Sequence, residues 1–403
     1  MILKTRSGGN VELRAGEWGT DHIIPRHGSQ WLSDTGLPIS ESDAYGLPAV
    51  SNIIRSSAGL TASLPFFVYR DGEVREPARD SWQWSLLHDQ PSPDCDSFRF
   101  FFDLVVSVEA TQNAFLQKIK LRNQVIALEV IDPHRVTVKI DKDTGEKTFD
   151  IWVAQGNIVR GIGADQILHV RGFTPNPGGP VGVSLIEIHA NTLGAQRAQQ
   201  KFEGDYFKSS GLPPFFFTGA ANSTHAQEIV ASYKAERARA GNTTPAGLWG
   251  PIDVKHIPYS MNDAAYIENK GLSLEDACAI WDWPIWLVRA KADDRAEPNA
   301  RMSEFLRTKF LPRLRRIERA FAADPDIFAG ESLFGEFLIA SLERADFQSR
   351  VRGYKDARQG GWVTANEIRK WENLPPTEGG DELQVTPVGG APNPNNEETN
   401  GND

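Results

Sequence analysis

Between residues 301 and 321 the chain alternates apolar and basic positions with the period of an α-helix. Pro312 lies inside this pattern, and because proline lacks an N–H and clashes with the preceding turn, we expect a kink or break there. The apolar positions recur at steps of three and four residues and share one face: Met302, Phe305, Leu306, Phe310, Leu314, Ile317 and Phe321. The basic positions project mostly from the opposite face: Arg301, Lys309, Arg315, Arg316 and Arg319. The segment predicts a kinked amphipathic helix with a basic back.

The first 183 residues predict a mixture of helices and strands. Residues 1–42 are rich in Gly, Ser and polar residues and predict a poorly ordered arm. A helix is expected from Pro48 to Ser63, and a longer one from a cap at Asp96 or Ser97 through Lys120. Strands are expected at 66–69, 124–131, 136–140, 148–153 and 166–170.

Two long helical stretches bracket a small α/β unit in the middle of the chain. The first runs from Ser184 to about Ser209, and the second from Asp263 to Ala290 with an aromatic, proline-broken end. The unit between them is expected to hold a strand at 214–218, a helix at 224–240 and strands that cover 247–259. A last helical pair is expected at 345–359 and 364–372, and the residues beyond 376 predict disorder.

Charge is distributed unevenly along the 403 residues. The formal net charge is −10, yet the tail from Pro376 carries six acids and no Lys or Arg, whereas Arg301 to Arg319 carries seven basic residues against two acids. Such a balance allows contact with nucleic acid at a local basic surface but does not favour tight wrapping. Cys95 and Cys278 match no metal or redox spacing, so a reducing compartment is expected. No secretory signal and no membrane span are predicted.

Motifs for catalysis are missing from the sequence. It holds no phosphate-binding loop, no H-E-x-x-H and no C-x-x-C, and the turn Asp141–Gly145 departs from a calcium loop. Acid pairs at Asp293–Asp294 and at Asp324 with Asp326 leave one alternative open, a metal-dependent nuclease or hydrolase. Another ring-forming virion adaptor is a second alternative. No enzyme activity, no cofactor and no metal site is predicted.

The order of several short motifs resembles the portal proteins of tailed double-stranded DNA phages, in the shorter branch found in long-tailed phages and prophages. The resemblance runs from about Tyr45 to Leu383. One departure is that Asp282-Trp283-Pro284-Ile285 stands where relatives commonly show Gly-Val-Pro-Pro. The motifs are the segment 49–70, His88 to Pro93, Val130 to Val136, Ile167 to Phe173, Gly182 to Glu187, Phe310 to Leu314, Ala345 to Phe347 and Asn373 to Pro376.

The resemblance implies an α+β portal fold, a homo-oligomeric ring that is a dodecamer in the virion, and a place at one capsid vertex. Such a ring would pass double-stranded DNA during packaging and ejection. It would dock the terminase large subunit and head-completion adaptor and contact the major capsid and scaffold proteins, after assembly in the host cytoplasm. The implied parts are a flexible arm 1–42, a wing 43–183, a first stem helix 184–210, a clip 211–259, a second stem helix 260–288, a tunnel loop 289–300, a kinked helix 301–339 returning to the wing, crown helices 340–375 and a disordered acidic tail 376–403.

The residues expected at the DNA tunnel are basic: Arg289, Lys291, Arg295 and Arg301. Such contacts go to phosphates without base readout, because DNA of every sequence must slide past. Solvated charges or salt bridges between subunits remain the alternative for Lys291 and Arg295. For Arg315, Arg316 and Arg319, pairing within the chain or between subunits is favoured over DNA. The tryptophans Trp281, Trp283 and Trp286 are expected to pack rather than to form a ligand cage.

Overall fold

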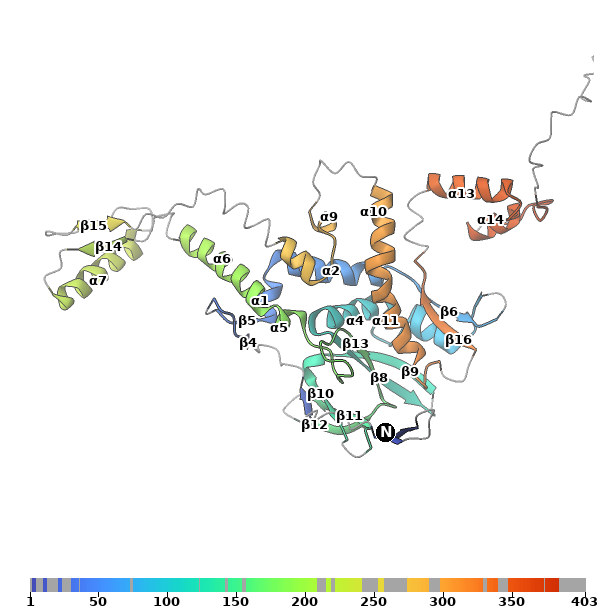
Figure 1. Cartoon of the computed structure of the whole chain (residues 1–403), viewed down its shortest axis with the longest axis horizontal. Coiled ribbons are helices and arrows are strands. Elements are labelled where there is room, and N and C mark those ends of the chain that lie inside the picture. The colour runs from blue at the N-terminus through green and yellow to red at the C-terminus, as the bar shows by residue number, and fades with distance from the viewer. Residues whose placement is uncertain are drawn as a thin grey trace, which may run out of the picture. The chain divides into compact units, whose positions relative to one another are not determined.

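A computed structural model gives the fold of the chain, which divides into two compact units, Met1–Phe337 and Leu338–Asp403. The structure mixes helices and strands in both halves of the first unit (Figure 1). The residues it describes are 2–4, 10–12, 21–23, 30–35, 37–72, 75–122, 124–141, 144–153, 157–208, 215–218, 222–240, 253–256, 274–289, 298–328, 332–339, 347–372 and 374–383.

Part of the segment expected to be a flexible arm is ordered in strands. Strand β3 (Asp21–Ile23) pairs with β10, and Ser40 caps α1 (Glu41–Tyr45) in a capping box with Asp43. Ile39 is fully buried. The prediction of a poorly ordered arm is therefore wrong for these residues, because β3 finds a strand far along the chain and Ser40 finds a local cap. The remaining strands of the arm are β1 (Ile2–Lys4), β2 (Asn10–Glu12), β4 (Gln30–Trp31) and β5 (Ile39–Ser40).

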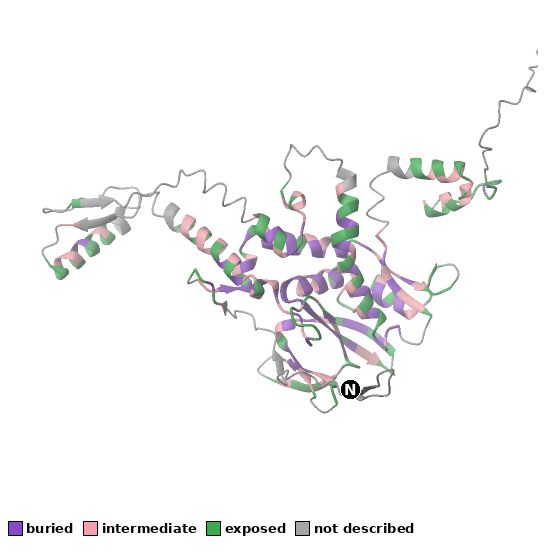
Figure 2. Ribbon diagram, viewed as in Figure 1, coloured by how far each residue is buried: buried purple, intermediate pink, exposed green. Residues whose placement is uncertain are grey.

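Two helices form the centre of the first unit. Helix α2 (Pro48–Ala62) begins with proline in its first turn, where the missing N–H costs nothing, and buries Val50, Ile53 and Ile54 at helical spacing. It packs against α4 (Ser97–Thr111), which Asp96 caps by accepting from the Arg99 N–H. Figure 2 shows buried residues concentrated along both helices and the strands beside them.

Helix α4 ends nine residues earlier than the sequence predicted. Gln112 adopts a left-handed conformation (φ 59°) and closes the helix with its N–H on the Val108 carbonyl. The chain then forms strand β8 (Asn113–Leu121). The prediction of a helix through Lys120 is wrong because β8 pairs with a strand on each side, and those partners override the helical pattern.

Two small sheets complete the layer beneath the helices. One has the order β13-β8-β9 and the other the order β12-β11-β10-β3, with all pairs antiparallel. Their facing side chains form one cluster that includes Phe115, Val138 and Phe149. The strands are β9 (Gln124–Ile131), β10 (Val136–Ile140), β11 (Lys147–Trp152), β12 (Ile158–Gly163) and β13 (Ile167–Arg171), with a 3-10 turn at Pro133–Arg135.

A third sheet joins distant parts of the first unit. Strand β16 (Leu333–Phe337) pairs antiparallel with β6 (Phe66–Arg70), and β7 (Glu76–Pro77) lies on the other side of β6. Behind this pairing, Phe66 contacts Phe101 and Phe337, with ring centroids 5.3 and 4.9 Å apart. The last strand of the unit therefore closes the core that the first helices begin. Between β7 and α4 lie α3 (Trp82–Trp84) and a π-helical turn, η1 (Ser85–Asp89).

The small α/β unit in the middle of the chain and the helical stretches before and after it follow the predicted order. The first long helix is α5 (Leu185–Ile188) followed by α6 (Ala190–Lys208), interrupted at His189. The insert contains β14 (Phe215–Thr218), α7 (Ser223–Ala240) and β15 (Asp253–His256), with β14 and β15 antiparallel. The second stretch is helical over 274–280, breaks at 281–284 as its proline-broken end predicted, and resumes as α9 (Ile285–Val288), which ends two residues before the predicted Ala290. Its part from 260 to 273 lies outside the described residues.

The predicted irregularity at Pro312 takes the form of a π-helical turn. Helix α10 (Pro298–Phe305) continues as η4 (Leu306–Phe310), where the Leu311 N–H reaches back five residues to the Leu306 carbonyl. Pro312 then lies in the first turn of α11 (Leu311–Ala322). Because proline has no N–H to donate and its ring crowds the preceding turn, one extra residue is accommodated directly before it.

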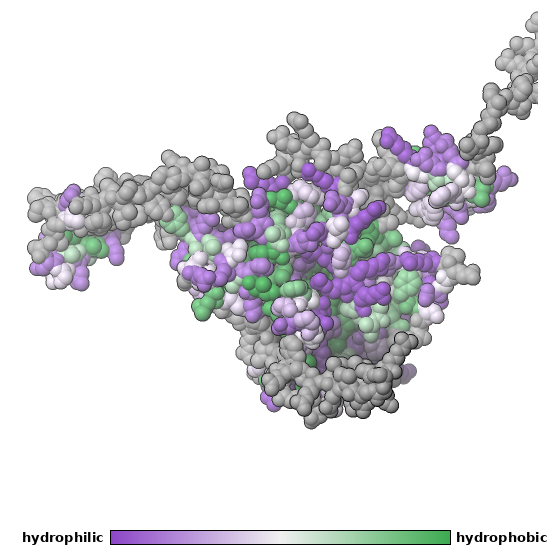
Figure 3. Space-filling model, viewed as in Figure 1, coloured by the Kyte–Doolittle hydropathy of each residue, from purple (hydrophilic) through white to green (hydrophobic). Residues whose placement is uncertain are grey.

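The second unit is small and open. Its helices are α13 (Phe347–Gln359) and α14 (Ala365–Trp371), and Thr364 with Glu367 forms a capping box at the start of α14. Asn366 bonds Thr377 and Gly380, so the prediction of disorder is wrong for residues 376–383, and the rest of the predicted tail lies outside the described residues. Hydrophilic and neutral residues cover most of its visible face (Figure 3).

Candidate functional site

Of the four basic residues predicted at a DNA tunnel, the structure describes two. Arg289 follows α9 and is exposed, and Arg301 lies in α10 and is partly buried. Lys291 and Arg295 lie outside the described residues. Arg289 is the first residue of the segment 289–300, and Arg301 directly follows it, so the described residues show how the fold holds the chain on each side of the segment.

Residues that flank this segment on both sides contact one another through aromatic rings, here called the tryptophan cluster: Trp283, Trp286, Phe305 and Phe310. The Phe305 ring of α10 lies 5.1 Å from that of Trp283 and 6.4 Å from that of Trp286, centroid to centroid. Trp281 and Trp283 are buried. The prediction that these tryptophans pack is confirmed, and it follows that the chain leaves and re-enters the fold at one place.

The break before α9 is a helix-terminating turn centred on Asp282. The Trp283 N–H bonds the Cys278 carbonyl and the Asp282 N–H bonds that of Ala279, which is the Schellman pattern. Asp282 has φ 48°, the left-handed conformation that glycine adopts most readily. Asp282 stands where the Gly-Val-Pro-Pro pattern has its glycine, and here the aspartate adopts the conformation that glycine favours. Lys309 of η4 pairs with the Asp282 carboxylate at 2.6 Å.

A buried ion pair holds this turn against α4. Arg313 of α11 pairs with the carboxylate of Glu109, and its other terminal nitrogen donates to the Trp281 carbonyl. The guanidinium carbon also lies 5.5 Å from the centre of the Trp283 ring. Glu109 accepts from the Ser57 hydroxyl at 2.8 Å as well, so its charge has partners from two helices. Burying a charge is tolerated only with such pairing.

Sequence reasoning missed Glu109 and Arg313 as residues of this site. The available signal was a charged residue on the buried face of α4, among Val105, Val108 and Ala110. A carboxylate on an apolar helix face needs a cation or several donors. The pattern alone does not say that the cation comes from a position 204 residues later.

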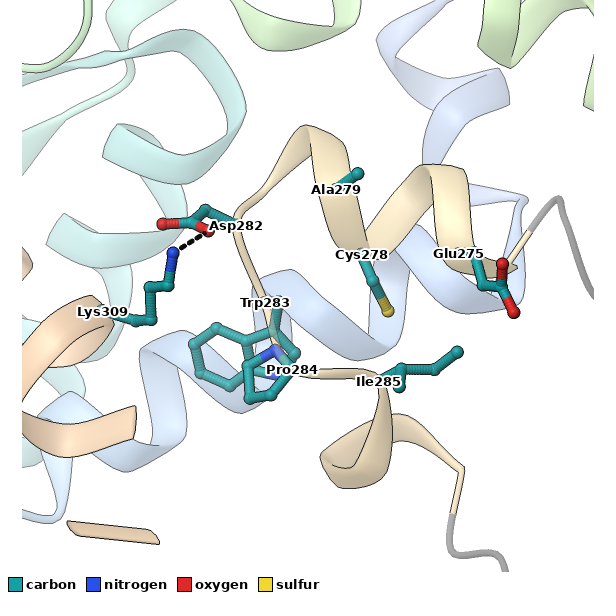
Figure 4. A pocket seen from close by; sticks show the side chains of 8 residues that line it. All are labelled: Glu275, Cys278, Ala279, Asp282, Trp283, Pro284, Ile285 and Lys309. Atoms are coloured by element: carbon teal, nitrogen blue, oxygen red, sulfur yellow. Dashed lines mark hydrogen bonds and ion pairs between the residues drawn. The ribbon is translucent and has the colours of Figure 1, made fainter. Parts of the chain in front are cut away.

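A groove of about 370 Å³ lies beside the Asp282 turn (Figure 4). Cys278 and Ile285 line its apolar part, and the Asp282–Lys309 pair lies at its edge. Burial, reinforced by the nearby Glu275 carboxylate, raises the pKa of the Cys278 thiol above its ordinary value. The thiol is therefore held in its unreactive, protonated form, and the groove offers no activated nucleophile.

The basic residues on the exposed face of the kinked helix interact largely with other residues of the same chain. Arg315 pairs with Glu318 at 2.8 Å and with Glu336 of β16 at 2.7 Å, which confirms intra-chain pairing for this residue. Burial lowers the pKa of Arg316 from its ordinary value, and the charge of Glu109 opposes this shift. Arg319 is exposed, and for it the prediction stays untested.

The acid pair Asp324 and Asp326 is occupied by lysines. Lys118 of β8 is fully buried and contacts the carboxylates of Asp324 and Asp326 at 2.8 and 2.6 Å, and Lys120 contacts Asp326 at 2.8 Å. Two ammonium groups on two carboxylates leave no net negative charge to attract a metal. The interpretation of this pair as metal ligands is therefore wrong, and no cluster of three or more His, Cys, Asp or Glu occurs among the described residues. Asp293 and Asp294 lie outside them.

Two of the motifs shared with portal proteins, Ile167 to Phe173 and Gly182 to Glu187, meet at the junction between α4 and β8. The Gly172 N–H bonds the Gln112 carbonyl, and the Phe173 N–H bonds the Gln112 side-chain oxygen. The Gly182 N–H bonds the Asn113 side-chain oxygen at 2.8 Å. A Cβ on Gly182 would lie 2.1 Å from the Gln112 carbonyl oxygen, so only glycine fits there. Both motifs thus close the loop that leads to α5.

Asn113 is also the last residue in a buried series of hydrogen bonds between side chains. The Lys147 ammonium donates to Nδ1 of His169 (2.6 Å), which leaves Nε2–H of His169 to donate to the Asn113 side-chain oxygen (3.0 Å). Burial and the charges of Lys147 and Arg171 hold the pKa of His169 well below its ordinary range. Burial lowers the pKa of Lys147 to about 8, and Arg171 adds to this effect. The arrangement requires a neutral imidazole.

Across the described part of the chain, no helix has both the length and the apolar run that a bilayer span requires.

Comparison with known proteins gives a consistent result. The probable portal protein of Streptomyces phage phiC31 is 23% identical over 374 residues, covering 86% of this chain and 78% of that protein. The portal protein of Enterobacteria phage HK97 is 22% identical over 415 residues, covering 96% and 95%.

Solved structures share the fold. A chain from the neck of an empty gene transfer agent particle, computed with C6 symmetry, superposes with a TM-score of 0.58 at 20% identity and covers 84% of this chain and 93% of its own length. An HK97-family phage portal protein from Corynebacterium diphtheriae gives a TM-score of 0.57 at 15% identity, covering 75% and 97%. A family model described as "Phage portal protein" matches residues 48–373, and the chain belongs to that family.

Proposed function

We propose that this chain assembles into the portal ring of a tailed phage or prophage, a dodecamer at one vertex of the capsid. Double-stranded DNA passes through the ring during packaging and leaves through it during ejection. The observation that carries this proposal is the family match together with the fold shared with a neck chain in a particle computed with C12 symmetry. That neck chain has a TM-score of 0.57 and is covered to 92% of its length.

The parts of the ring follow the order of elements along the chain. The sheets with α2 and α4 form the wing, and β16 returns the kinked helix to it. The insert with β14, α7 and β15 forms the clip, which docks the terminase large subunit during packaging and the head-completion adaptor afterwards. The proposed parts are the wing 43–183, stem helices 184–210 and 260–288, clip 211–259, tunnel loop 289–300, kinked helix 301–339 and crown 340–375.

The tunnel loop is where DNA phosphates are contacted. Its two ends are fixed in the tryptophan cluster, and Arg289 at its start is exposed. Cations of this kind, interspersed with Asp293 and Asp294, make weak contacts that break quickly and carry no sequence preference. A conduit needs this property because bound DNA must keep moving.

The DNA contact is tested by neutralising Lys291 and Arg295 together, as K291Q/R295Q, in a packaging reaction with purified capsids. We expect intact rings with altered packaging or reduced retention of packaged DNA. The matched control R122Q/R160Q removes two exposed wing cations and is expected to package normally. Unchanged packaging by K291Q/R295Q would remove this loop from the DNA path.

The ring itself is tested by negative-stain electron microscopy of the purified protein, with the mass measured on the same sample. Rings with a central hole of about 20 Å or more, wide enough for duplex DNA, and a mass near twelve chains are the expected result. A homogeneous monomer or small dimer at every salt concentration would contradict the proposal. Assembly in the host cytoplasm and contacts with the major capsid and scaffold proteins belong to the same proposal.

A further inference from the structure

Five consecutive residues, Glu109–Asn113, receive contacts from both ends of the stem; we call them the α4 end. All five are buried, with at most 5% of any residue exposed. They comprise the last turn of α4, the left-handed Gln112 and the first residue of β8. The last carbonyls of a helix lack partners within the helix, so their hydrogen bonds must come from elsewhere.

The first stem helix supplies some of these partners. The Ser184 hydroxyl donates to the Ala110 carbonyl at 2.7 Å and accepts from the Ile186 N–H, so it caps α5 and ties it to α4 at once. Asn113 bonds Gly182 through both its side-chain oxygen and its side-chain nitrogen. The chain is thus fixed to the α4 end directly before it enters the stem.

The second stem segment supplies the others. The indole N–H of Trp281 donates to the Glu109 carbonyl at 3.2 Å, and Arg313 joins the Glu109 carboxylate to the Trp281 carbonyl. The chain is fixed here directly after it leaves the helical segment 274–280 and before the tunnel loop.

Each of the last four carbonyls of α4 therefore has a donor: the α4 end itself supplies two, and the two stem segments supply one each. Gln112 bonds Val108, Trp281 bonds Glu109, Ser184 bonds Ala110, and the Asn113 side chain bonds Thr111. Adjacent residues of one helical turn, Glu109 and Ala110, thus hold opposite ends of an excursion of almost one hundred residues, from Ser184 to Trp281. Because the packing of this helical turn is dense, a displacement of Ala110 also displaces the adjacent Glu109, so Ser184 and Trp281 do not move independently.

We propose that the α4 end couples the two stem segments, so that displacement of the first, at Ser184, changes how the second is held at Trp281. The residues that position this coupling are Ser184 and Asn113 on one side, and Glu109, Arg313 and Trp281 on the other. The role of this coupling in the assembled ring rests on the proposed portal function, in which the clip and stem contact the packaging motor. Coupling of this kind is demonstrated only by a response at one side to a change at the other.

Cys278 provides the readout, because it is buried one turn before Trp281 and lines the groove in Figure 4. The chain has two cysteines, so C95S leaves Cys278 as the single thiol. The rate at which a thiol reagent modifies Cys278 in the full-length protein reports local opening at the end of the second stem segment. Neither a ring nor DNA is needed, so failure here is distinguishable from failure of the proposed function.

The test variant is S184A in the C95S background, with S81A as the matched control. Ser81 makes the same two kinds of bond, donating to the Ala78 carbonyl and accepting from the Trp84 N–H, but contacts no part of the α4 end. We expect S184A to raise the Cys278 rate about fivefold, the factor that corresponds to roughly 1 kcal/mol. S81A should leave the rate at the parent value, and S184T, which keeps the hydroxyl, should restore it.

A double-mutant cycle completes the test. E109Q alone should also raise the rate of Cys278 modification. The free-energy change of the double variant S184A/E109Q should differ from the sum of the changes of the two single variants. The changes of S81A and E109Q should be additive. Far-ultraviolet circular dichroism at the reaction temperature establishes that each variant is folded. A parent-like rate in folded S184A, or additivity of S184A with E109Q, would overturn the coupling.

Discussion

The two compact units differ in how far apart in sequence their contacts lie. In the first unit, the buried Glu109 pairs with the partly buried Arg313, and Phe66 packs on Phe337 with both rings buried. In the described part of the second unit, side-chain contacts span few residues: Tyr354 bonds Glu372, and Asn366 bonds Thr377. Among its described residues Gly380 alone is buried. The first unit therefore carries its own core, whereas the second depends on local caps and turns.

This difference predicts which substitutions the chain tolerates. A buried, long-range contact involves groups that have no alternative partner, so its loss leaves a cavity, a clash or an unpaired charge. A local contact at the surface is replaced by water. Four measurements test this difference between the two units.

The largest difference is expected between two glycine-to-alanine substitutions. G182A places a methyl group against the Gln112 backbone and should destabilise the first unit by about 3 kcal/mol, because backbone cannot move aside. G353A, in the interior of α13 with open space around it, should instead stabilise its helix by about 0.5–1 kcal/mol. Denaturant unfolding followed by circular dichroism gives both values. Equal effects would show that the two units do not differ in packing.

The next effect concerns ion pairs. E109Q leaves the Arg313 guanidinium buried without its counter-charge, and we expect a loss of about 2–4 kcal/mol in unfolding free energy. The exposed Arg70–Asp80 pair is the control, and D80N should give no measurable change. If both substitutions behave alike in urea titrations, burial of the Glu109 pair contributes nothing.

A smaller effect is expected from pH. The folded-state pKa of His169 lies below that of the unfolded chain, so below about pH 6.5 the unfolded state binds a proton that the folded state does not. Stability should therefore fall as the pH is lowered from 7 to 5. Lys147 acts in the same direction between about pH 10 and its folded pKa of about 8. H169Q should flatten the acid limb relative to the parent, and parallel curves would exclude His169 as its source.

The smallest effect is expected at Trp362, which is 84% exposed in the second unit. W362S removes a large side chain that buries little surface, so the unfolding free energy should change by no more than about 0.5 kcal/mol. Thermal unfolding of the unassembled chain gives the value. A loss of 2 kcal/mol or more would mean that this tryptophan is covered within the chain.

Local pattern was enough to predict many elements. Helix α2, strands β9 and β10, the insert and the amphipathic kinked helix follow from apolar period, caps and proline, all of which act within a few residues. The same reasoning located the break at Trp281–Pro284 and the packing role of its tryptophans. The order of short motifs then pointed to the portal family before any contact was known.

Only the tertiary structure decided where the predicted helices end and which distant residues are in contact. Helix α4 stops at Thr111 because β8 finds a strand on either side, and part of the arm is ordered because β10 pairs with it. Glu109 and Arg313 were beyond reach for the same reason, since the energy of a buried ion pair depends on a partner that sequence spacing does not reveal. Local free energies thus specify the elements, and contacts between distant residues fix their ends and join them at the α4 end.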